Sequence, residues 1–222
     1  MNQIRAGWPI TSLLILILSA CNHQPSYGID IYFVRENRFS KIESNYRSGN
    51  VGYFWATWND DGWIQHATIL LSTEIGQGNR NHLLREELTQ SLGLMKDSSK
   101  YTESIFYSGE SDGTNYLAID RQVVRMLYQE AIHPNLAADE VRQVLGENFN
   151  QQEITYFQEV ALGSEYGEAA AGIRKWQADI PLRVHGDPTE MDLHELKQII
   201  TEVNPLLGGL ELMLEAPHLE GQ

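Results

Sequence analysis

The chain has 222 residues, of which 42% are hydrophobic and 9% aromatic, so it is long enough and apolar enough to bury a sizeable core. It carries 16 basic and 30 acidic residues, a formal net charge of -14. This excess of negative charge argues against a nucleic-acid partner, because phosphates would be repelled, and it leaves no basic patch for anionic lipid. We expect one domain.

The N-terminus predicts a lipoprotein signal peptide over residues 1–20. Arg5 gives a positive start, residues 8–18 are apolar but short for a transmembrane helix, and Leu18-Ser19-Ala20-Cys21 resembles the bacterial lipobox. Cys21 is the only cysteine, which excludes an intrachain disulfide and makes it the expected lipidation site. A diacylglyceryl group with an N-acyl chain would anchor the protein firmly. The alternative is an ordinary cleaved signal with an incidental cysteine.

These features predict that the protein is located in the bacterial cell envelope and is attached to the membrane through the lipid anchor. A short tether, residues 21–28, would join the anchor to the domain. Asn22 follows the cysteine, and the absence of Asp there favours sorting to the periplasmic face of the outer membrane.

The segment after the tether predicts the first part of a sheet. Residues 29–34 alternate as in a strand, and residues 51–58 and 63–71 form a predicted hairpin around an Asn-Asp-Asp-Gly turn. Residues 35–50 are expected to be loop with a little strand. The tryptophans of the hairpin form either a binding surface or a cover for the sheet edge: Trp55, Trp58 and Trp63.

Residues 81–97 predict a central helix, capped by Asn81 and ending near Gly93. One stripe is apolar and expected in the core: Leu84, Leu88, Leu92 and Met95. The polar stripe contains His82, Glu86, Gln90 and Gly93. The simpler interpretation is a solvated face. The sharper one is that His82 and Glu86, one turn apart, hold a metal, with Glu87 placed to polarise a bound water.

The remaining elements complete one predicted α/β (α+β) domain with a mixed, twisted sheet. A β-α-β unit over residues 156–215 needs a neighbouring sheet, so it is joined to residues 29–145 rather than set apart. Residues 146–155 are the expected linker and 216–222 a flexible tail. The predicted segments are a loop at 97–115, helices at 121–130 (N-cap Asp120), 136–145, 156–162 and 189–203, and strands at 178–184 and 210–214.

Two motifs together resemble the metzincin metallopeptidases, whose helix carries HExxHxxGxxH. Glu86, Glu87, Gln90, Gly93 and Lys96 stand where the first His, catalytic Glu, second His, Gly and third His would be. Ser104, Ile105 and Phe106 resemble the Met-turn with Phe in place of Met, and Asp120 with Leu127 and Tyr128 resembles the helix that follows. More specifically, H-x3-EE-x2-Q-x-LGL is similar to the bacterial lipoprotein family catalogued as domain of unknown function 2927, which is metzincin-like in fold and has no established activity.

The resemblance implies a circularly permuted order, because in that family segments like 156–214 precede segments like 29–145. If so, the strand ending at Leu214 and the strand beginning at Ile29 should lie side by side or end to end in one sheet.

The resemblance leaves zinc as a candidate cofactor without requiring it. His82, Glu86, Gln90 and Asp97 are the candidate ligands and Glu87 the candidate general base. Lys96 adds a repelling cation, so we expect a metallopeptidase-like domain used for binding or envelope assembly, with an envelope protein or peptide as partner and no efficient peptidase activity. The alternative is a metal-dependent peptidase with a non-standard ligand set. The other histidines are expected to be surface or satisfied core residues: His66, His133, His185, His194 and His218.

Overall fold

The computed structural model describes residues 26–109, 113–163 and 172–216. The predicted signal peptide, Cys21, most of the tether and nearly all of the predicted tail lie outside these residues. In the ranges described, no helix is both long and apolar enough to cross a bilayer.

The fold is built on one mixed five-stranded sheet with the order β2-β3-β1-β4-β5. Only β2 runs antiparallel to its neighbour; the other neighbouring strands are parallel. Because β4 and β5 extend the sheet that contains β1, the two ends of the chain build one α+β domain, as the sequence predicts. The strands are β1 (Gly28–Val34), β2 (Gly52–Trp58), β3 (Ile64–Ser72), β4 (Ile180–Gly186) and β5 (Leu212–Leu214).

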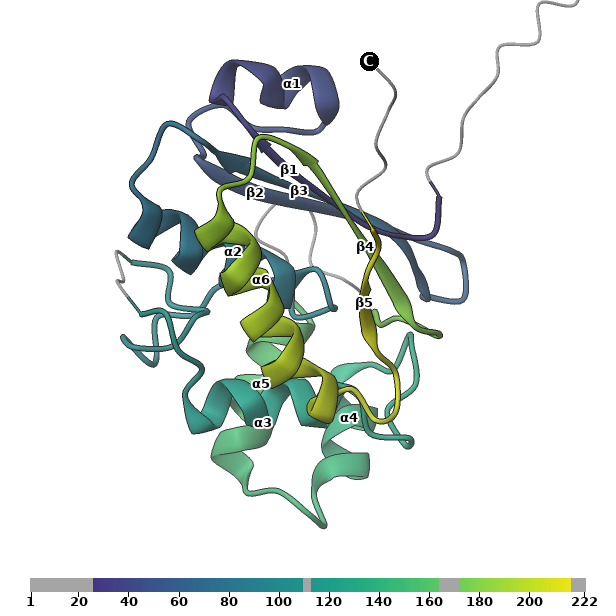
Figure 1. The fold of residues 1–222 in the computed structure, drawn as a ribbon. Helices are drawn as coiled ribbons and strands as arrows, with labels where there is room; N and C mark the ends of the chain where they lie inside the picture. The colour runs from purple at the N-terminus through teal and green to yellow at the C-terminus, as the bar shows by residue number, and fades with distance from the viewer. Residues whose placement is uncertain (1–25, 110–112, 164–171, 217–222) are drawn as a thin grey trace, which may run out of the picture.

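Helices lie on both sides of this sheet (Figure 1). The helices α2 (Gln77–Gln90) and α6 (Glu190–Val203) cover one face, and α6 makes the crossover between the parallel strands β4 and β5. The short helix α1 (Phe39–Ile42) lies on the opposite side. The other helical segments are the 3-10 turns η1 (Glu36–Arg38) and η2 (Asn204–Leu206) and the helices α3 (Ala118–Leu127), α4 (Ala138–Leu145) and α5 (Gln151–Ala161).

Both faces of β1 carry apolar side chains, so helices pack against both faces of the sheet. Ile29, Ile31 and Phe33 are fully buried in the main core, which lies between the sheet and α2 with α6. The alternate residues face the other side, where a smaller cluster forms around Phe39 of α1. The apolar stripe predicted on the central helix is in the main core: Leu84, Leu88, Leu92 and Met95 are all buried.

The bounds of the central helix differ from the prediction. Helix α2 has its N-cap at Gly76, so Asn81 lies inside the helix rather than capping it. The helix ends three residues before Gly93, whose φ of 119° is the left-handed conformation that favours glycine. A Cβ atom at Gly93 would also collide with the carbonyl oxygen of Arg174.

Three other local predictions were wrong. Asp120 is the third residue of α3, and its carboxylate accepts from the backbone N–H of Leu117, the actual N-cap. Helix α5 begins inside the predicted linker, because the Asn150 side chain caps it by accepting from two backbone N–H groups. Residues 35–50 contain η1 and α1 and no strand.

The expected contact between the strands of Leu214 and Ile29 was also wrong. Both strands belong to the same sheet, but β4 lies between β1 and β5. The reason is strand order: β1 pairs with β3 on one edge and with β4 on the other, so β5 pairs with β4 at the edge of the sheet.

Candidate functional site on helix α2

Helix α2 follows β3 in the chain and packs against β2, β3 and α6. Leu84 and Leu88 face the core, which leaves the remaining sides of the helix for polar residues. These residues fall into two groups. One faces α6, and the other contains the positions that resemble the zinc-peptidase motif.

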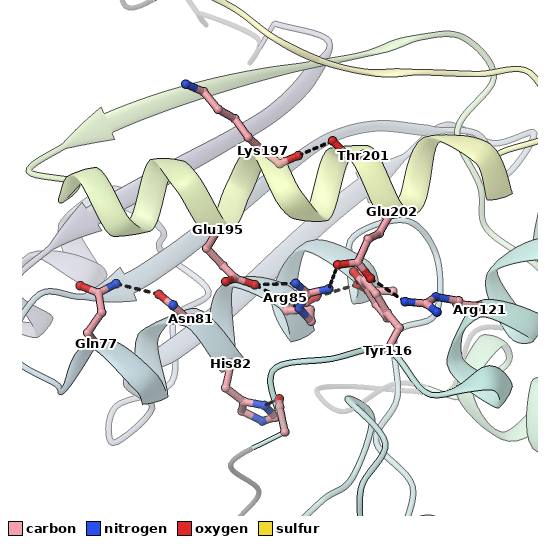
Figure 2. A network of polar contacts seen from close by, with 12 residues as sticks. Gln77, Asn81, His82, Arg85, Tyr116, Arg121, Glu195, Lys197, Thr201 and Glu202 are labelled. Atoms are coloured by element: carbon pink, nitrogen blue, oxygen red, sulfur yellow. Dashed lines mark hydrogen bonds and ion pairs between the residues drawn. The ribbon is translucent and has the colours of Figure 1, made fainter.

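The first group forms ion pairs with acidic residues of α6. Arg80 Nε lies 2.8 Å from Asp192 Oδ1, and Arg85 Nη2 lies 2.6 Å from Glu195 Oε1, with all four side chains nearly inaccessible to solvent. Arg85 Nη1 also lies 3.2 Å from the less buried Glu202 (Figure 2). Burial acts to raise the pKa of Asp192, but the hydrogen bonds from Arg80 and its other partners outweigh it and hold the pKa below its usual range. The pairs hold α2 to α6.

Arg85 is further enclosed by the segment that leads into α3. Its guanidinium lies 4.6 Å from the ring centre of Tyr116, whose hydroxyl is 2.7 Å from Thr89 Oγ1. Burial raises the pKa of the Tyr116 phenol, so it stays neutral. Arg121 Nη2 completes the group at 2.7 Å from Glu202 Oε2. Sequence analysis did not find this network, because partners such as Arg85 and Glu202 are 117 residues apart.

The predicted metal ligands form two separate pairs in the second group. His82 Nε2 lies 3.5 Å from Glu86 Oε2, and Gln90 Nε2 donates to Asp97 Oδ1 at 2.5 Å. His82 Nδ1 is 2.5 Å from the carbonyl oxygen of Gly113 and must donate there, because a carbonyl only accepts. Figure 2 shows His82 pointing away from α6. The two pairs lie one helical turn apart on the same side of α2.

Glu87, the predicted general base, lies on a different side of α2 from the two pairs. Glu87 is buried against β2, where a Cβ atom at residue 52 would lie 2.9 Å from its Oε1. Lys96, at the position of the third zinc histidine, is exposed, and its alkyl chain packs against Gly163. Over the described part of the chain, no three His, Cys, Asp or Glu side chains are grouped so as to hold a metal ion. This donor set does not fit a closed zinc tripod, which needs three converging ligands.

The segment Ser104-Ile105-Phe106 is a buried turn tied to α3 and α5. Ser104 Oγ donates to Asp120 Oδ1 at 2.6 Å and lies 2.9 Å from the Tyr156 hydroxyl. Burial raises the pKa of Asp120 even though several hydrogen bonds to its carboxylate lower it. The Phe106 carbonyl accepts from the backbone N–H of Ser98, so the turn is joined to the chain that leaves α2. The predicted Met-turn segment is therefore hydrogen-bonded to the chain eight residues beyond the end of α2.

A cavity of about 320 Å³ opens beside Arg85, between α6 and the segment before α3. Its wall combines the exposed cation Lys197 with the partly exposed anion Glu202. Mixed charges of this kind can hold a polar ligand. The lining residues are Arg85, Asn115, His194, Lys197, Gln198, Thr201 and Glu202.

A protein-family comparison identifies the chain. The family described as "Protein of unknown function (DUF2927)" matches residues 16–147, more than half of the 222-residue chain. The chain belongs to this family. Searches of curated proteins and of solved structures found no match. The DUF2927 match contains β1–β3 and α2, whereas the acidic partners of Arg80 and Arg85 lie on α6, beyond its end.

The structure also brings together polar residues that sequence analysis left apart. His66 and His185, expected to be surface or satisfied core residues, both contact Asp30 on the outer face of the sheet. The available signal was strand alternation, because Asp30, His66 and His185 each lie in a strand with a second polar side chain two residues away.

Proposed function

We propose that this DUF2927 protein is a lipid-anchored bacterial envelope protein. Its metallopeptidase-like domain would bind a protein or peptide without hydrolysing peptides efficiently. The observation that supports this proposal is the state of α2: its motif positions are engaged in the pairs His82–Glu86 and Gln90–Asp97, while Glu87 faces β2. Ligands that do not converge on one ion cannot acidify a water for a general base to use.

A metzincin-like fold in circularly permuted order is part of the same proposal. The fold is supported by the placement of α2 directly after a sheet strand, the glycine turn at Gly93, and the buried Ser104–Phe106 turn bonded to the chain after α2. The permuted order rests on the resemblance in segment order, because the strand contact expected from it is not formed. The unit β4-α6-β5 completes the sheet beside β1, as one domain requires whichever half comes first in the chain.

The binding role is supported by the cavity beside Arg85. Its floor is held rigid by the buried pair of Arg85 and Glu195, and its rim carries Lys197 and Gln198 on the solvent side of α6. A rigid base with exposed polar groups suits recognition of a polar peptide segment.

The anchor is tested by Cys21→Ser in the full-length protein. We expect the variant to leave the membrane fraction, while Asn22→Asp, which keeps the cysteine, stays membrane-bound and moves to the inner membrane of a Gram-negative cell. Mass spectrometry that finds an unmodified Cys21 in the membrane-bound wild type would reject lipidation.

The absence of efficient peptidase activity is tested by metal analysis of the detergent-solubilised full-length protein, together with a peptide hydrolysis assay. We expect far less than one zinc per chain, no hydrolysis, and an unchanged cellular role in Glu87→Gln. The matched control is Glu147→Gln at an exposed position.

Stoichiometric zinc, with hydrolysis lost in Glu87→Gln and kept in Glu147→Gln, would establish the alternative peptidase with a non-standard ligand set. One observation favours that alternative. His82 Nδ1 donates to the Gly113 carbonyl, as the second ring nitrogen of a metal-binding histidine often does, and its Nε2 lies 3.5 Å from Glu86 Oε2. A ring nitrogen and a carboxylate oxygen placed in this way can share a cation.

A further inference from the structure

The outer face of the sheet, opposite α2 and α6, contains a cavity of about 490 Å³. Helix α1 and the small cluster around Phe39 cover one end of this face, and the cavity occupies the uncovered part. Four strands contribute to its wall. The lining residues are Ser26, Asp30, Tyr32, Ile42, Glu43, Trp55, Thr57, His66, Thr68, Arg183 and His185.

Strand register places the central residues of the cavity in one line. Asp30 is paired with Thr68 on one side and Arg183 on the other, and Thr68 is paired with Trp55. Neighbouring strands are about 4.8 Å apart, so these four side chains form a continuous row across β2, β3, β1 and β4. An aromatic ring therefore stands at one end of the row and a guanidinium at the other.

A hydrogen-bonded group around Asp30 fixes the polar end of the row. Arg183 Nε donates to Asp30 Oδ1 at 2.7 Å, His185 Nε2 lies 2.8 Å from the same oxygen, and His66 Nε2 lies 3.1 Å from Oδ2. Burial acts to raise the pKa of Asp30, but hydrogen bonds from Arg183 and His185 outweigh it and keep the carboxyl ionised. The Tyr32 ring stacks on His185 with ring centres 4.4 Å apart. The group is thus rigid before any ligand arrives.

The other polar groups of the cavity wall determine which hydrogen-bond donors and acceptors a ligand must have. A carboxylate only accepts, so both histidines donate their Nε2–H to Asp30. Burial lowers the pKa of His66, so its neutral ring keeps an accepting lone pair on Nδ1. Within the described residues, the Thr68 and Tyr32 hydroxyls and the Trp55 indole N–H make no hydrogen bond to the protein. A ligand here must both donate and accept hydrogen bonds.

The charges of the cavity select against ions. Asp30 is balanced by Arg183, and burial lowers the pKa of His66, which keeps that ring neutral at neutral pH. A phosphate or carboxylate would face the Nδ1 lone pair of His66 and the nearby Glu43. A metal ion at Asp30 would be repelled by the guanidinium that already occupies this carboxylate.

We propose that this outer-face cavity is a binding site for a neutral saccharide. Sugar hydroxyls both donate and accept, which matches His66 Nδ1, the hydroxyls of Thr68 and Tyr32, and the indole N–H of Trp55. A pyranose also has a flat, mainly C–H face that can pack on the Trp55 ring. The site is separate from the cavity beside Arg85, and its occupancy does not depend on the function proposed for α2.

The test uses the full-length protein in detergent and three defined probes: maltotriose, cellotriose and triacetylchitotriose. At least one should bind by titration calorimetry. Thr68→Val should weaken that binding about 2- to 10-fold, as expected for one lost hydrogen bond, because valine keeps the shape and suits a strand. The control is Thr155→Val on the exposed side of α5, which should bind as the wild type does.

Tryptophan fluorescence gives a second readout. Binding should change the emission of the wild type, and the change should be lost in Trp55→Phe, which keeps an aromatic ring but removes the indole. Thermal melting checks that each variant is folded. Lack of binding to all three saccharides, equal affinity of wild type and Thr68→Val, or binding of inorganic phosphate with saccharides excluded would each overturn the proposal.

Discussion

The α2–α6 interface and the outer-face cavity use the same kinds of side chain for opposite purposes. Both contain an arginine paired with a carboxylate, at 2.6 Å between Arg85 and Glu195 and at 2.7 Å between Arg183 and Asp30. At the interface a second helix covers the pair, whereas on the outer face the neighbouring His185 keeps 38% of its side chain exposed. The two regions differ in burial by a neighbouring element and not in residue type. This burial decides whether a polar group stabilises the fold or is available to a ligand.

The two regions also differ in how their charged side chains are paired. At the interface Asp192 and Glu195 of α6 are each paired with an arginine of α2, so removal of Arg80 or Arg85 leaves a buried charge alone. On the outer face a single carboxylate contacts one arginine and two histidines, and water can reach the group from the cavity. Substitutions should therefore affect folding at the first region and ligand binding or pH response at the second.

The largest effect is expected from Leu88→Asp, in the apolar layer between α2 and the sheet. Leu88 is fully buried, and an unpaired carboxylate there would cost several kcal/mol, comparable to the roughly 5–15 kcal/mol that stabilises a domain. We expect loss of the folded state by circular dichroism. Met191→Asp, at an exposed position in the first turn of α6, should melt like the wild type. A folded Leu88→Asp protein would show that α2 does not need its buried face.

The next effect is expected from Arg85→Met, which removes the cation at the centre of the interface. Glu195 would remain buried without its partner, at a cost of about 3–5 kcal/mol in the free energy of unfolding measured with urea. Adding Glu195→Gln should recover part of this loss. Arg142→Met, which breaks an exposed pair with Asp139, should change stability by less than about 0.5 kcal/mol. Equal losses for the two arginines would contradict the distinction between covered and exposed pairs.

The smallest effect is expected on the outer face, as a pH dependence. The pKa of His66 is lowered in the folded protein by burial, so below about pH 6.5 the unfolded chain takes up a proton that the folded state resists. Stability from this group is therefore complete above about pH 6.5 and is lost as the pH falls toward the lowered pKa, by at most about 1.4 kcal/mol per pH unit.

His66→Gln, which keeps a donor near Asp30 but does not titrate, should lose stability less steeply than the wild type between pH 7 and 5 in thermal melts. His133→Gln, at an exposed position, should follow the wild-type curve. A wild-type slope in His66→Gln would mean that His66 is not the group that resists protonation.

Local sequence patterns predicted most of the elements but not all of their ends. Alternation located β1–β3, and the spacing of Leu84, Leu88 and Leu92 identified the buried side of α2. The errors occurred where a polar side chain can either cap a helix or lie within its first turns. Asn81 could cap a helix but lies within α2, and Asp120 caps α3 from its third position. Capping residues have equivalent chemistry at several offsets, so the sequence leaves such ends open by a few residues.

The sequence by itself determined the α+β class, the apolar face of the central helix and membership of DUF2927, because periodicity and motif spacing are properties of neighbouring residues. Only the tertiary structure decided which polar groups meet. Arg85 and Glu195 are 110 residues apart, and Asp30 and His185 are 155 apart, so nothing local links them. Strand order and helix crossover create these contacts, and the same geometry covers one group and leaves the other open to water.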